Sequence, residues 1–502
     1  VNDEIYKQNY FEHILNRHEQ ACVIAAEGYA RSTGKTGVAI VTSGPGFTNA
    51  ITGIADAYMD SIPVVIISGQ VPTTIIGTDG FQEIDAVGIS RPCTKHNYLV
   101  NKIEDLPRII KEAFHLASTG RPGPVHVDIP KDITAQLGEF IYPSEVSMPT
   151  YKPTLNYNKK QLKRAMEAIK KKKKPLLYIG GGAILSNCGY EIRDLAKKLN
   201  IPAVETLMAR GVMGDENPLF FGMLGMHGEY AANMAAHETD LLISLGARFD
   251  DRVTGRLDEF ASKAKVIHID IDPTSIAKLV VADYPIVGDL KLTVEAMIED
   301  SENYEINDFS NWVELLKDYR EKEPLRYIDT DDLIKPQWPI QRVGKILGDN
   351  AIISTDVGQH QMWTAQFFPF SHPRQWITSG GLGTMGFGLP AALGAARAFK
   401  GTNRVVVNFT GDGSILMNIQ ELMTCSEYEL PVINIVLNNN YLGMVRQWQT
   451  MFYENRLAET DLSAQPKFKM LAEAFNCLGY TVSTKAEFDE AFKDAVEKRK
   501  PA

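Results

Sequence analysis

Two polar side chains stand where successive strands are predicted to end. Asp412 lies within Gly411-Asp-Gly-Ser414, directly after the β-branched run at 405–410, and Asn439 follows a second apolar run at 432–437. Parallel sheets bring such ends to one edge, where open α/β sheets bind their ligands. Carboxylate and amide oxygens suit Mg²⁺, and glycines at a helix N-terminus favour an anion. The pattern predicts a magnesium-bridged diphosphate site, and its alternative is a turn followed by an unrelated Asn-rich loop.

The elements that position these residues repeat along the chain. Apolar residues at helical spacing from 415 to 429 predict a helix between the two strands. Further short apolar runs predict strands at 38–42, 64–68, 125–129, 176–179, 240–245 and 266–271. We therefore predict an α/β protein of three doubly wound parallel-sheet domains, at 1–135, 158–300 and 338–502. A Pro-bearing stretch at 136–157 and a charged region at about 301–337 are the predicted connections.

Length and composition exclude several classes of protein. A chain of 502 residues is too long for one core, and its 44% hydrophobic and 23% charged residues are typical of globular proteins. The net charge, 52 − 62 = −10, argues against nucleic acid or an anionic membrane as the main partner. No apolar run reaches the ~18–20 residues that span a membrane. The five cysteines lack a Cys-x-x-Cys pair, which indicates reduced thiols.

The spacing of Asp412 and Asn439 resembles the thiamine diphosphate-binding motif. That resemblance implies that Asp412 and Asn439 bind the metal through their side chains, and Tyr441 through its backbone carbonyl. Thiamine chemistry also needs a carboxylate at the N1′ atom of the aminopyrimidine, held in an apolar pocket that raises its proton affinity. Glu19, just before a predicted helix at 21–32, is the candidate. A solvated acid at a helix start is the alternative.

Motifs along the whole chain make the resemblance closer. The sequence is similar to the catalytic large subunit of acetohydroxyacid synthase (acetolactate synthase). The matching stretches are Arg17-His-Glu-Gln20, Ala26-Glu-Gly-Tyr-Ala-Arg31, Thr42-Ser-Gly-Pro-Gly46, Gly77-Thr-Asp-Gly-Phe-Gln-Glu83, Gly225-Met-His-Gly228, Arg248-Phe-Asp-Asp-Arg-Val-Thr-Gly255, His268-Ile-Asp-Ile-Asp272, Val357-Gly-Gln-His-Gln-Met-Trp363, Gly380-Gly-Leu-Gly-Thr-Met-Gly-Phe-Gly-Leu-Pro390 and Leu442-Gly-Met-Val445.

This resemblance implies a role for each matched position. Glu19 is the N1′ partner and the catalytic residue. The residues expected to bind thiamine diphosphate are Gln359, His360, Met362, Gly383, Met385, Gly411, Gly413, Ser414, Asn440, Leu442, Gly443 and Met444. The substrate residues are Phe81, Gln82, Arg252, which pairs with the carboxylate of the second 2-ketoacid, and Trp448, which favours 2-ketobutyrate over pyruvate.

The family's central domain binds FAD, which has no net redox role in the overall reaction. Glycines at 180–182 after a predicted strand, and acids at the end of another, agree with nucleotide binding. Gly-Gly-Gly is not the dinucleotide fingerprint, so the resemblance carries the FAD prediction. The positions it implies are Arg121, Gly181, Gly182, Thr206, Leu207, Arg248, Asp250, Asp270, Ile271 and Asp289.

The predicted function is acetolactate synthase, a thiamine diphosphate-dependent transferase with Mg²⁺ and FAD. Pyruvate is decarboxylated, and the hydroxyethyl carbanion condenses with pyruvate or 2-ketobutyrate in the first common step of branched-chain amino acid biosynthesis. The resemblance implies a homodimer or homotetramer, a small regulatory subunit, and a cytoplasmic protein of bacteria or archaea, with a plastid as the other compartment. We also expect a fragment that lacks both ends of the family's chain. The alternatives are another thiamine diphosphate carboligase or oxidase, and a non-catalytic paralogue.

Overall fold

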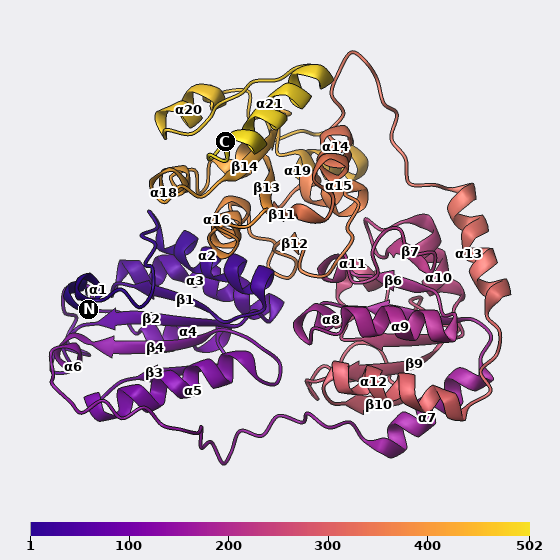
Figure 1. Cartoon of the computed structure of the whole chain (residues 1–502), viewed down its shortest axis with the longest axis horizontal. Coiled ribbons are helices and arrows are strands. Elements are labelled where there is room, and N and C mark those ends of the chain that lie inside the picture. The colour runs from indigo at the N-terminus through magenta and orange to yellow at the C-terminus, as the bar shows by residue number, and fades with distance from the viewer. Residues whose placement is uncertain (1) are drawn as a thin grey trace.

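Three parallel β-sheets with flanking helices make up the protein. The computed structural model describes residues 2–502, and Figure 1 shows three lobes, with the first at the left, the central one at the right and the third at the top. Every pair of neighbouring strands runs parallel. The predicted α/β class is therefore confirmed. In the part of the chain that the structure describes, no helix combines the length and the apolar character that a membrane crossing requires.

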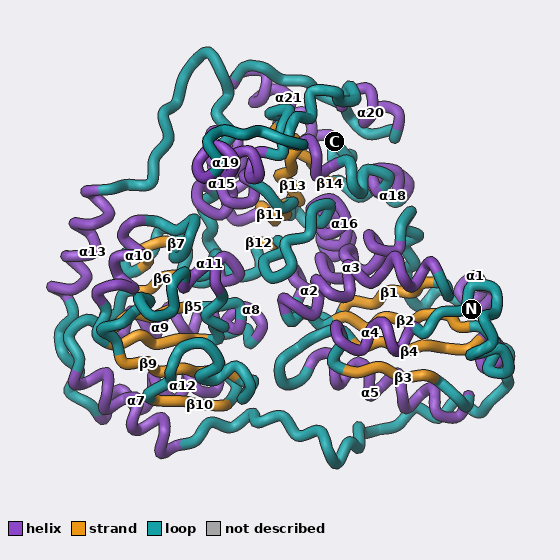
Figure 2. Tube along the Cα trace, turned by 180° about the vertical axis from the view of Figure 1, so that it is seen from behind, coloured by secondary structure: helices purple, strands orange, loops and turns teal. Residues whose placement is uncertain are grey.

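The first lobe is a four-stranded sheet in the order β1-β2-β4-β3. The inner strands β2 and β4 are largely buried, as expected where helices cover both faces, whereas the edge strand β1 exposes Val38 and Ile40. The elements are α1 (Asn2–Lys7), α2 (Glu19–Thr33), β1 (Gly37–Val41), α3 (Pro45–Asp60), β2 (Val64–Gln70), α4 (Ala86–Ser90), η1 (Arg91–Cys93), β3 (His96–Leu99), η2 (Ile103–Asp105), α5 (Leu106–Ser118), β4 (Val125–Pro130) and α6 (Lys131–Thr134). An extended segment without helix or strand then leads to α7 and runs along the lower edge of both views (Figure 1, Figure 2).

The central lobe is a six-stranded sheet in the order β10-β9-β8-β5-β6-β7. The order in which successive strands are added reverses between β5 and β8, and such a switch point is where open α/β sheets bind nucleotides. The elements are α7 (Lys159–Lys171), β5 (Pro175–Ile179), α8 (Gly182–Leu185), α9 (Gly189–Leu199), β6 (Ala203–Glu205), η3 (Leu207–Ala209), β7 (Phe220–Met223), α10 (Tyr230–Glu238), β8 (Leu241–Leu245), α11 (Asp251–Thr254), β9 (Lys265–Asp270), β10 (Tyr284–Val287), α12 (Leu290–Asp300) and η4 (Ser301–Asn303).

The charged region after the central sheet is more than a connection. It contains α13 (Ser310–Lys322), which lies along the outer edge of the central lobe in Figure 1. Trp312 and Leu316 are buried in the central core, and the Trp312 indole donates to the carbonyl of Pro175 at 2.9 Å. The charged residues of α13 therefore lie opposite an apolar face that packs on the central sheet.

The third lobe is a four-stranded sheet in the order β12-β11-β13-β14. Its elements are α14 (Gln337–Leu347), η5 (Gly348–Asn350), β11 (Ala351–Thr355), α15 (Gln359–Phe367), β12 (Trp376–Ile377), α16 (Gly388–Ala398), β13 (Val405–Gly411), α17 (Asp412–Ile415), α18 (Glu421–Glu427), β14 (Val432–Leu437), α19 (Gly443–Phe452), α20 (Phe468–Ala474) and α21 (Lys485–Lys498).

The predicted helix from 415 to 429 is wrong in its extent. The structure has two short helices, α17 and α18, separated by a turn. Asn418 in this turn donates its side-chain amide to the carbonyl of Gly386 at 2.7 Å. Helical spacing of apolar residues does not reveal such a contact, which fixes the turn to the loop before α16. Helix α2 also begins earlier than predicted, because His18 caps it by accepting from the backbone N–H of Gln20 at 3.1 Å.

Helices α2 and α16 join the first lobe to the third with their backbones in close approach. A Cβ atom at Gly28 would lie 2.0 Å from the carbonyl oxygen of Ala391, and one at Gly394 would lie 1.9 Å from that of Ala25. Only glycine fits at these two crossing points. The two lobes are therefore held in a fixed relation at the middle of α2, the helix that begins with Glu19.

Candidate active site

Three neighbouring strands of the third sheet end at one edge, and their following loops carry the predicted diphosphate residues. Strand β13 lies between β11 and β14, and Gly411 is the register partner of Leu437. Gln359 and His360 begin α15 after β11, Asp412 begins α17 after β13, and Asn439 follows β14. The structure therefore brings these segments, far apart in sequence, to a common edge.

Asp412 is a nearly buried acid with two hydrogen-bonded oxygens. Its side chain accepts from the backbone N–H of Gly413 at 3.1 Å and, through the other oxygen, from the side-chain amide of Gln465. It is 2% exposed. A buried carboxylate at a helix start is suited to a cation, because the ion replaces the water that burial has removed.

Asn439 and Tyr441 form a tight turn after β14. The Asn439 side-chain oxygen accepts from the N–H of Tyr441 at 2.9 Å, and the Arg446 guanidinium lies 3.6 Å from the centroid of the Tyr441 ring. The turn pairs with the segment near residue 460, since the N–H of Leu442 donates to the carbonyl of Thr460 at 2.9 Å. The Tyr441 ring thus packs beside Arg446, and the role of its carbonyl as a metal ligand stays a prediction.

The surroundings of His360 indicate whether this edge of the sheet can bind a diphosphate. Its ring is buried, burial lowers its pKa to about 4, and its Nε2 atom has no hydrogen-bond partner among residues 2–502. A buried polar atom without a partner is rare in folded proteins. The neighbouring Gln359 side chain donates to Gln447 of α19 at 2.8 Å. The orphaned imidazole nitrogen and the oxygens of Asp412 and Asn439 therefore fit a magnesium diphosphate.

The site differs in kind from a zinc or transition-metal centre. Within residues 2–502, no group of three or more His, Cys, Asp and Glu side chains is arranged to hold a metal ion. The predicted magnesium ligands include only one acid, and the other donors are an amide and a carbonyl. This donor set suits a cation that shares its coordination with phosphate oxygens and water.

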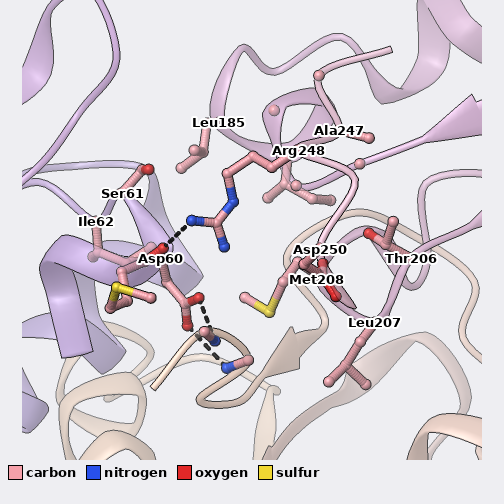
Figure 3. Close-up of a pocket in the computed structure, with 18 of the residues that line it drawn as sticks. Asp60, Ser61, Ile62, Leu185, Thr206, Leu207, Met208, Ala247, Arg248 and Asp250 are labelled. Carbon is pink, nitrogen blue, oxygen red and sulfur yellow. Dashed lines mark hydrogen bonds between the residues drawn. The ribbon is translucent and has the colours of Figure 1, made fainter. Parts of the chain in front are cut away.

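A cavity of about 1370 Å³ lies where the three lobes meet. Figure 3 shows part of its wall, with Asp60 and Arg248 close together and Thr206, Leu207 and Asp250 nearby. Its volume exceeds that of a site for one drug-sized ligand. The predicted residues that line it are Arg121, Gly181, Gly182, Thr206, Leu207, Arg248, Asp250, Arg252, Asp270, Ile271, Asp289, Met362, Gly383, Met444 and Trp448.

The central lobe presents its switch point to this cavity. Glycines 180–182 follow β5 and residues 246–248 follow β8, and the N–H of Gly182 donates to the carbonyl of Gly246 at 3.0 Å. Thr206, which lines the cavity, has a buried hydroxyl without a partner. Burial raises the pKa of Asp270 to about 6. A nucleotide with ribose and phosphate groups fits this wall, because it offers both donors and acceptors to these atoms.

Glu19 lies in the first lobe, outside the cavity. It is the first residue of α2, half-buried, and its carboxylate accepts from the side chain of Asn49 at 3.1 Å. It does not line the cavity, and neither do Phe81 and Gln82. Phe81 is 90% exposed, and the carbonyl oxygen of Gln82 would lie 2.8 Å from a Cβ at Gly44. These three residues share one region of the first lobe, around the loop that precedes α3.

Arg252 and Trp448 line the cavity from different lobes. Arg252 is the second residue of α11, its side chain is 65% exposed, and its only ion pair among the described residues is with Asp251 at 3.8 Å. Trp448 is 38% exposed on α19, a helix without buried residues, and packs against Phe452 with 5.3 Å between ring centroids and the rings tilted by 58°. The guanidinium and the indole are therefore both accessible to a ligand.

The remaining predicted residues lie on the third lobe. Met385 precedes α16, Gly413 and Ser414 belong to α17, and Asn440, Leu442 and Gly443 form the entry to α19. Ser414 donates to the carbonyl of Val357 at 3.4 Å, which connects the loop after β13 to that after β11.

Sequence reasoning missed two side chains near the predicted site. Gln465 donates to Asp412 from 53 positions away. Glu421 of α18 accepts from the backbone N–H groups of Arg17 and His18, at 2.9 and 3.1 Å, just before Glu19. Both contacts join segments without a shared motif, and an amide or an acid in isolation is ordinarily a surface residue.

Comparison with known proteins agrees with this geometry. Three family profiles match in order: the thiamine pyrophosphate enzyme N-terminal TPP binding domain at residues 1–89, the central domain at 162–297, and the C-terminal TPP binding domain at 356–502. The acetolactate synthase isozyme 3 large subunit of Escherichia coli is 48% identical over 99% of this chain and 87% of its own. The probable acetolactate synthase large subunit of Methanocaldococcus jannaschii is 46% identical over 97% of this chain and 84% of its own.

Proposed function

The chain belongs to the family of acetolactate synthase large subunits, which are thiamine pyrophosphate enzymes, and we infer that it is an acetolactate synthase. The overall reaction joins two molecules of pyruvate and releases CO₂, giving 2-acetolactate. With 2-ketobutyrate as the second substrate, the product is 2-aceto-2-hydroxybutyrate. The observation that carries this inference is the 48% identity to an acetolactate synthase over 99% of the chain.

The edge of the third sheet would hold magnesium and the diphosphate. Asp412, Asn439 and the carbonyl of Tyr441 would bind the cation, and the unpartnered nitrogen of His360 would accept a hydrogen bond from, or donate one to, the diphosphate end of the cofactor. Thiamine diphosphate, when bound, supplies the carbon nucleophile that protein side chains lack. Gln465, which now occupies one oxygen of Asp412, would release that oxygen to the metal.

Glu19 would hold a proton at the N1′ atom of the aminopyrimidine. Its carboxylate is fixed by Asn49, and the backbone before it is fixed by Glu421, so its position at the start of α2 is well determined. A group that gives and takes a proton at one atom must be held within hydrogen-bond reach of it. The contacts of Glu19 support this proposal because they hold its carboxylate in one position.

The central lobe would bind FAD in the wall of the large cavity. The residues that support this proposal are the glycines after β5, the unpartnered hydroxyl of Thr206 and the acid Asp270 at the end of β9. Arg248 and Asp250 lie in the same wall (Figure 3). The flavin would have no net redox role in the reaction.

Arg252 and Trp448 would select the second substrate. An accessible guanidinium binds a carboxylate through two parallel hydrogen bonds. An accessible indole gives apolar contact to an ethyl group that a methyl group cannot use. Both side chains line the same cavity, which supports a joint role in recognising a 2-ketoacid.

A second copy of the chain would complete the active site. Glu19, Phe81 and Gln82 lie outside the cavity that Arg252 and Trp448 line, although the same reaction needs all five. We therefore propose a homodimer in which the first lobe of one copy meets the third lobe of the other. A small regulatory subunit is the further partner that the large-subunit relatives imply.

The function is tested by incubating the purified protein with pyruvate, thiamine diphosphate, Mg²⁺ and FAD, and then measuring acetolactate and the flavin spectrum. An acetolactate synthase forms acetolactate while the oxidised flavin spectrum stays unchanged. Bleaching of the flavin by pyruvate, with acetate or acetyl phosphate as product, would identify an oxidase instead. Absence of any product with intact cofactor binding would identify a non-catalytic paralogue.

A further inference from the structure

A buried ionic cluster lies where the first lobe meets the loop before α16. Arg31 of α2 forms ion pairs with Glu27, Asp56 and Asp60, at 3.1, 3.1 and 2.9 Å. All four side chains are at most 5% exposed. One guanidinium thus serves three carboxylates out of contact with water. Burying these charges costs free energy, and apolar side chains would hold the same interface at a lower cost. We therefore expect the cluster to have a role besides stabilising the interface.

The carboxylate oxygens of Asp56 and Asp60 also accept hydrogen bonds from the loop from 379 to 384. Asp60 accepts from the backbone N–H groups of Gly380 and Gly381, at 3.0 and 2.8 Å, one on each oxygen. Asp56 accepts from the hydroxyls of Ser379 and Thr384, both at 2.5 Å. In Figure 3 the two lower dashed lines mark these contacts of the Asp60 carboxylate, and the upper one marks the bond from Arg248 to the carbonyl of Met59. Four donors of one short loop therefore converge on two carboxylates of a different lobe.

Ser379 links Asp56 to the backbone of the loop through hydrogen bonds. Its hydroxyl donates to Asp56 and accepts from the N–H groups of Gly383 and Thr384, at 3.0 and 2.9 Å. Burial raises the pKa of Asp56, whereas Arg31 and the two hydroxyl donors oppose that rise. The charged form of Asp56 is the one these partners stabilise. The conformation of the loop thus depends on charged side chains of α2 and α3.

The same loop forms part of the cavity and leads to predicted cofactor residues. Residues 380–383 line the cavity, and Met385 follows directly. We propose that Asp56 and Asp60, oriented by Arg31, are positioning residues that hold the loop from 379 to 384 in the shape that binds thiamine diphosphate. This inference rests on the proposed function of the third lobe, and it assigns a task to three residues that are not among the predicted thiamine diphosphate ligands.

Ser379→Ala is the sharpest test, because it removes the hydroxyl that links Asp56 to the loop backbone and leaves every charge of the cluster in place. Ser32→Ala is the matched control: it removes a buried hydroxyl of α2 that donates to the carbonyl of Gly28 at 2.8 Å and does not contact the loop. Each variant is titrated with thiamine diphosphate at saturating Mg²⁺, and kcat, the half-saturating cofactor concentration and the melting temperature are measured.

We expect Ser379→Ala to raise the half-saturating concentration about tenfold or more, since a buried hydrogen bond to a charged group is lost. Saturating cofactor should restore kcat to within about threefold of the parent, because no group that takes part in the reaction has been removed. The melting temperature should match that of Ser32→Ala. Asp56→Asn should weaken cofactor binding in the same direction, and if it fails to fold, Ser379→Ala carries the test.

Two results would overturn the proposal. One is a Ser379→Ala protein with the cofactor affinity of Ser32→Ala. The other is a loss of kcat that saturating cofactor does not restore. A parent protein that binds no thiamine diphosphate would overturn the proposed function as well, whereas a parent that binds it beside an unaltered Ser379→Ala variant would overturn this inference alone.

Discussion

Replacement of Trp448 by leucine should change which ketoacid the enzyme prefers. Trp448 is 38% exposed, lines the cavity and belongs to a helix without buried residues. It is therefore a wall of the cavity and not part of a core. In the Trp448→Leu variant the cavity stays open, and the flat apolar surface offered to a substrate ethyl group is lost.

The size of the effect follows from one methylene group. Burial of a CH₂ is worth about 0.8 kcal/mol, and discrimination by one methylene in an apolar pocket spans about 1–3 kcal/mol. Because the indole stays partly exposed, we expect the lower part of that range. The preference for 2-ketobutyrate over pyruvate should fall about tenfold, since 1.4 kcal/mol corresponds to a factor of ten.

The assay is a competition between the two ketoacids, with both products measured in one reaction. Tyr453→Leu is the control, because Tyr453 follows α19, is 54% exposed and does not line the cavity. We expect Tyr453→Leu to keep the parental product ratio and Trp448→Leu to retain pyruvate turnover. Melting curves should differ little, since surface substitutions change stability by about 0.5 kcal/mol or less. An unchanged product ratio in a stable Trp448→Leu protein would refute the assignment.

Three further predictions concern the metal ligand Asp412, the proton-transferring Glu19 and the buried His126. Asp412→Ala should abolish tight thiamine diphosphate binding, because Mg²⁺ loses its one charged protein ligand; unchanged affinity by calorimetry would contradict this. Glu19→Gln should keep cofactor binding and lower kcat by about 10²–10⁴-fold, and mixing it with Asp412→Ala under conditions that exchange subunits should restore about a quarter of parental activity if a site is shared between two copies. No recovery in exchanged mixtures would place each site within one chain. Burial lowers the pKa of His126 to about 3, so its neutral form stabilises the fold above about pH 6.5 and this stability is lost as pH falls below it. By pH 4.5 the loss amounts to about 2.7 kcal/mol, and His126→Gln should flatten that part of the stability profile; an equal slope in both proteins would show that His126 does not titrate there.

Much of the fold follows from local sequence. Strands β13 and β14 form at runs rich in β-branched residues, which Asn408 and Asn434 interrupt, because both faces of a parallel strand are covered by helices. That same rule places Asp412 and Asn439 at one edge of a sheet. Strand β3 escapes the rule, since it begins with the polar pair His96 and Asn97 at the edge of its sheet.

The contacts between lobes do not follow from local sequence. Glu421 reaches the backbone before Glu19 across 403 positions or more, and Asp56 reaches Ser379 across 323. An acid on a helix gives the same local signal whether it meets water or the backbone of another lobe. Only the crossing of α2 and α16, fixed by Gly28 and Gly394, decides between these outcomes.

The carbon balance of the reaction tests the central claim most directly. Purified protein with thiamine diphosphate, Mg²⁺ and FAD is given uniformly ¹³C-labelled pyruvate without oxygen, and the products are followed by NMR together with released CO₂. An acetolactate synthase consumes two pyruvates for each CO₂ and each acetolactate, and Glu19→Gln slows all three together. Release of one CO₂ for every pyruvate consumed, with acetaldehyde as product, would contradict the assignment of this chain as an acetolactate synthase.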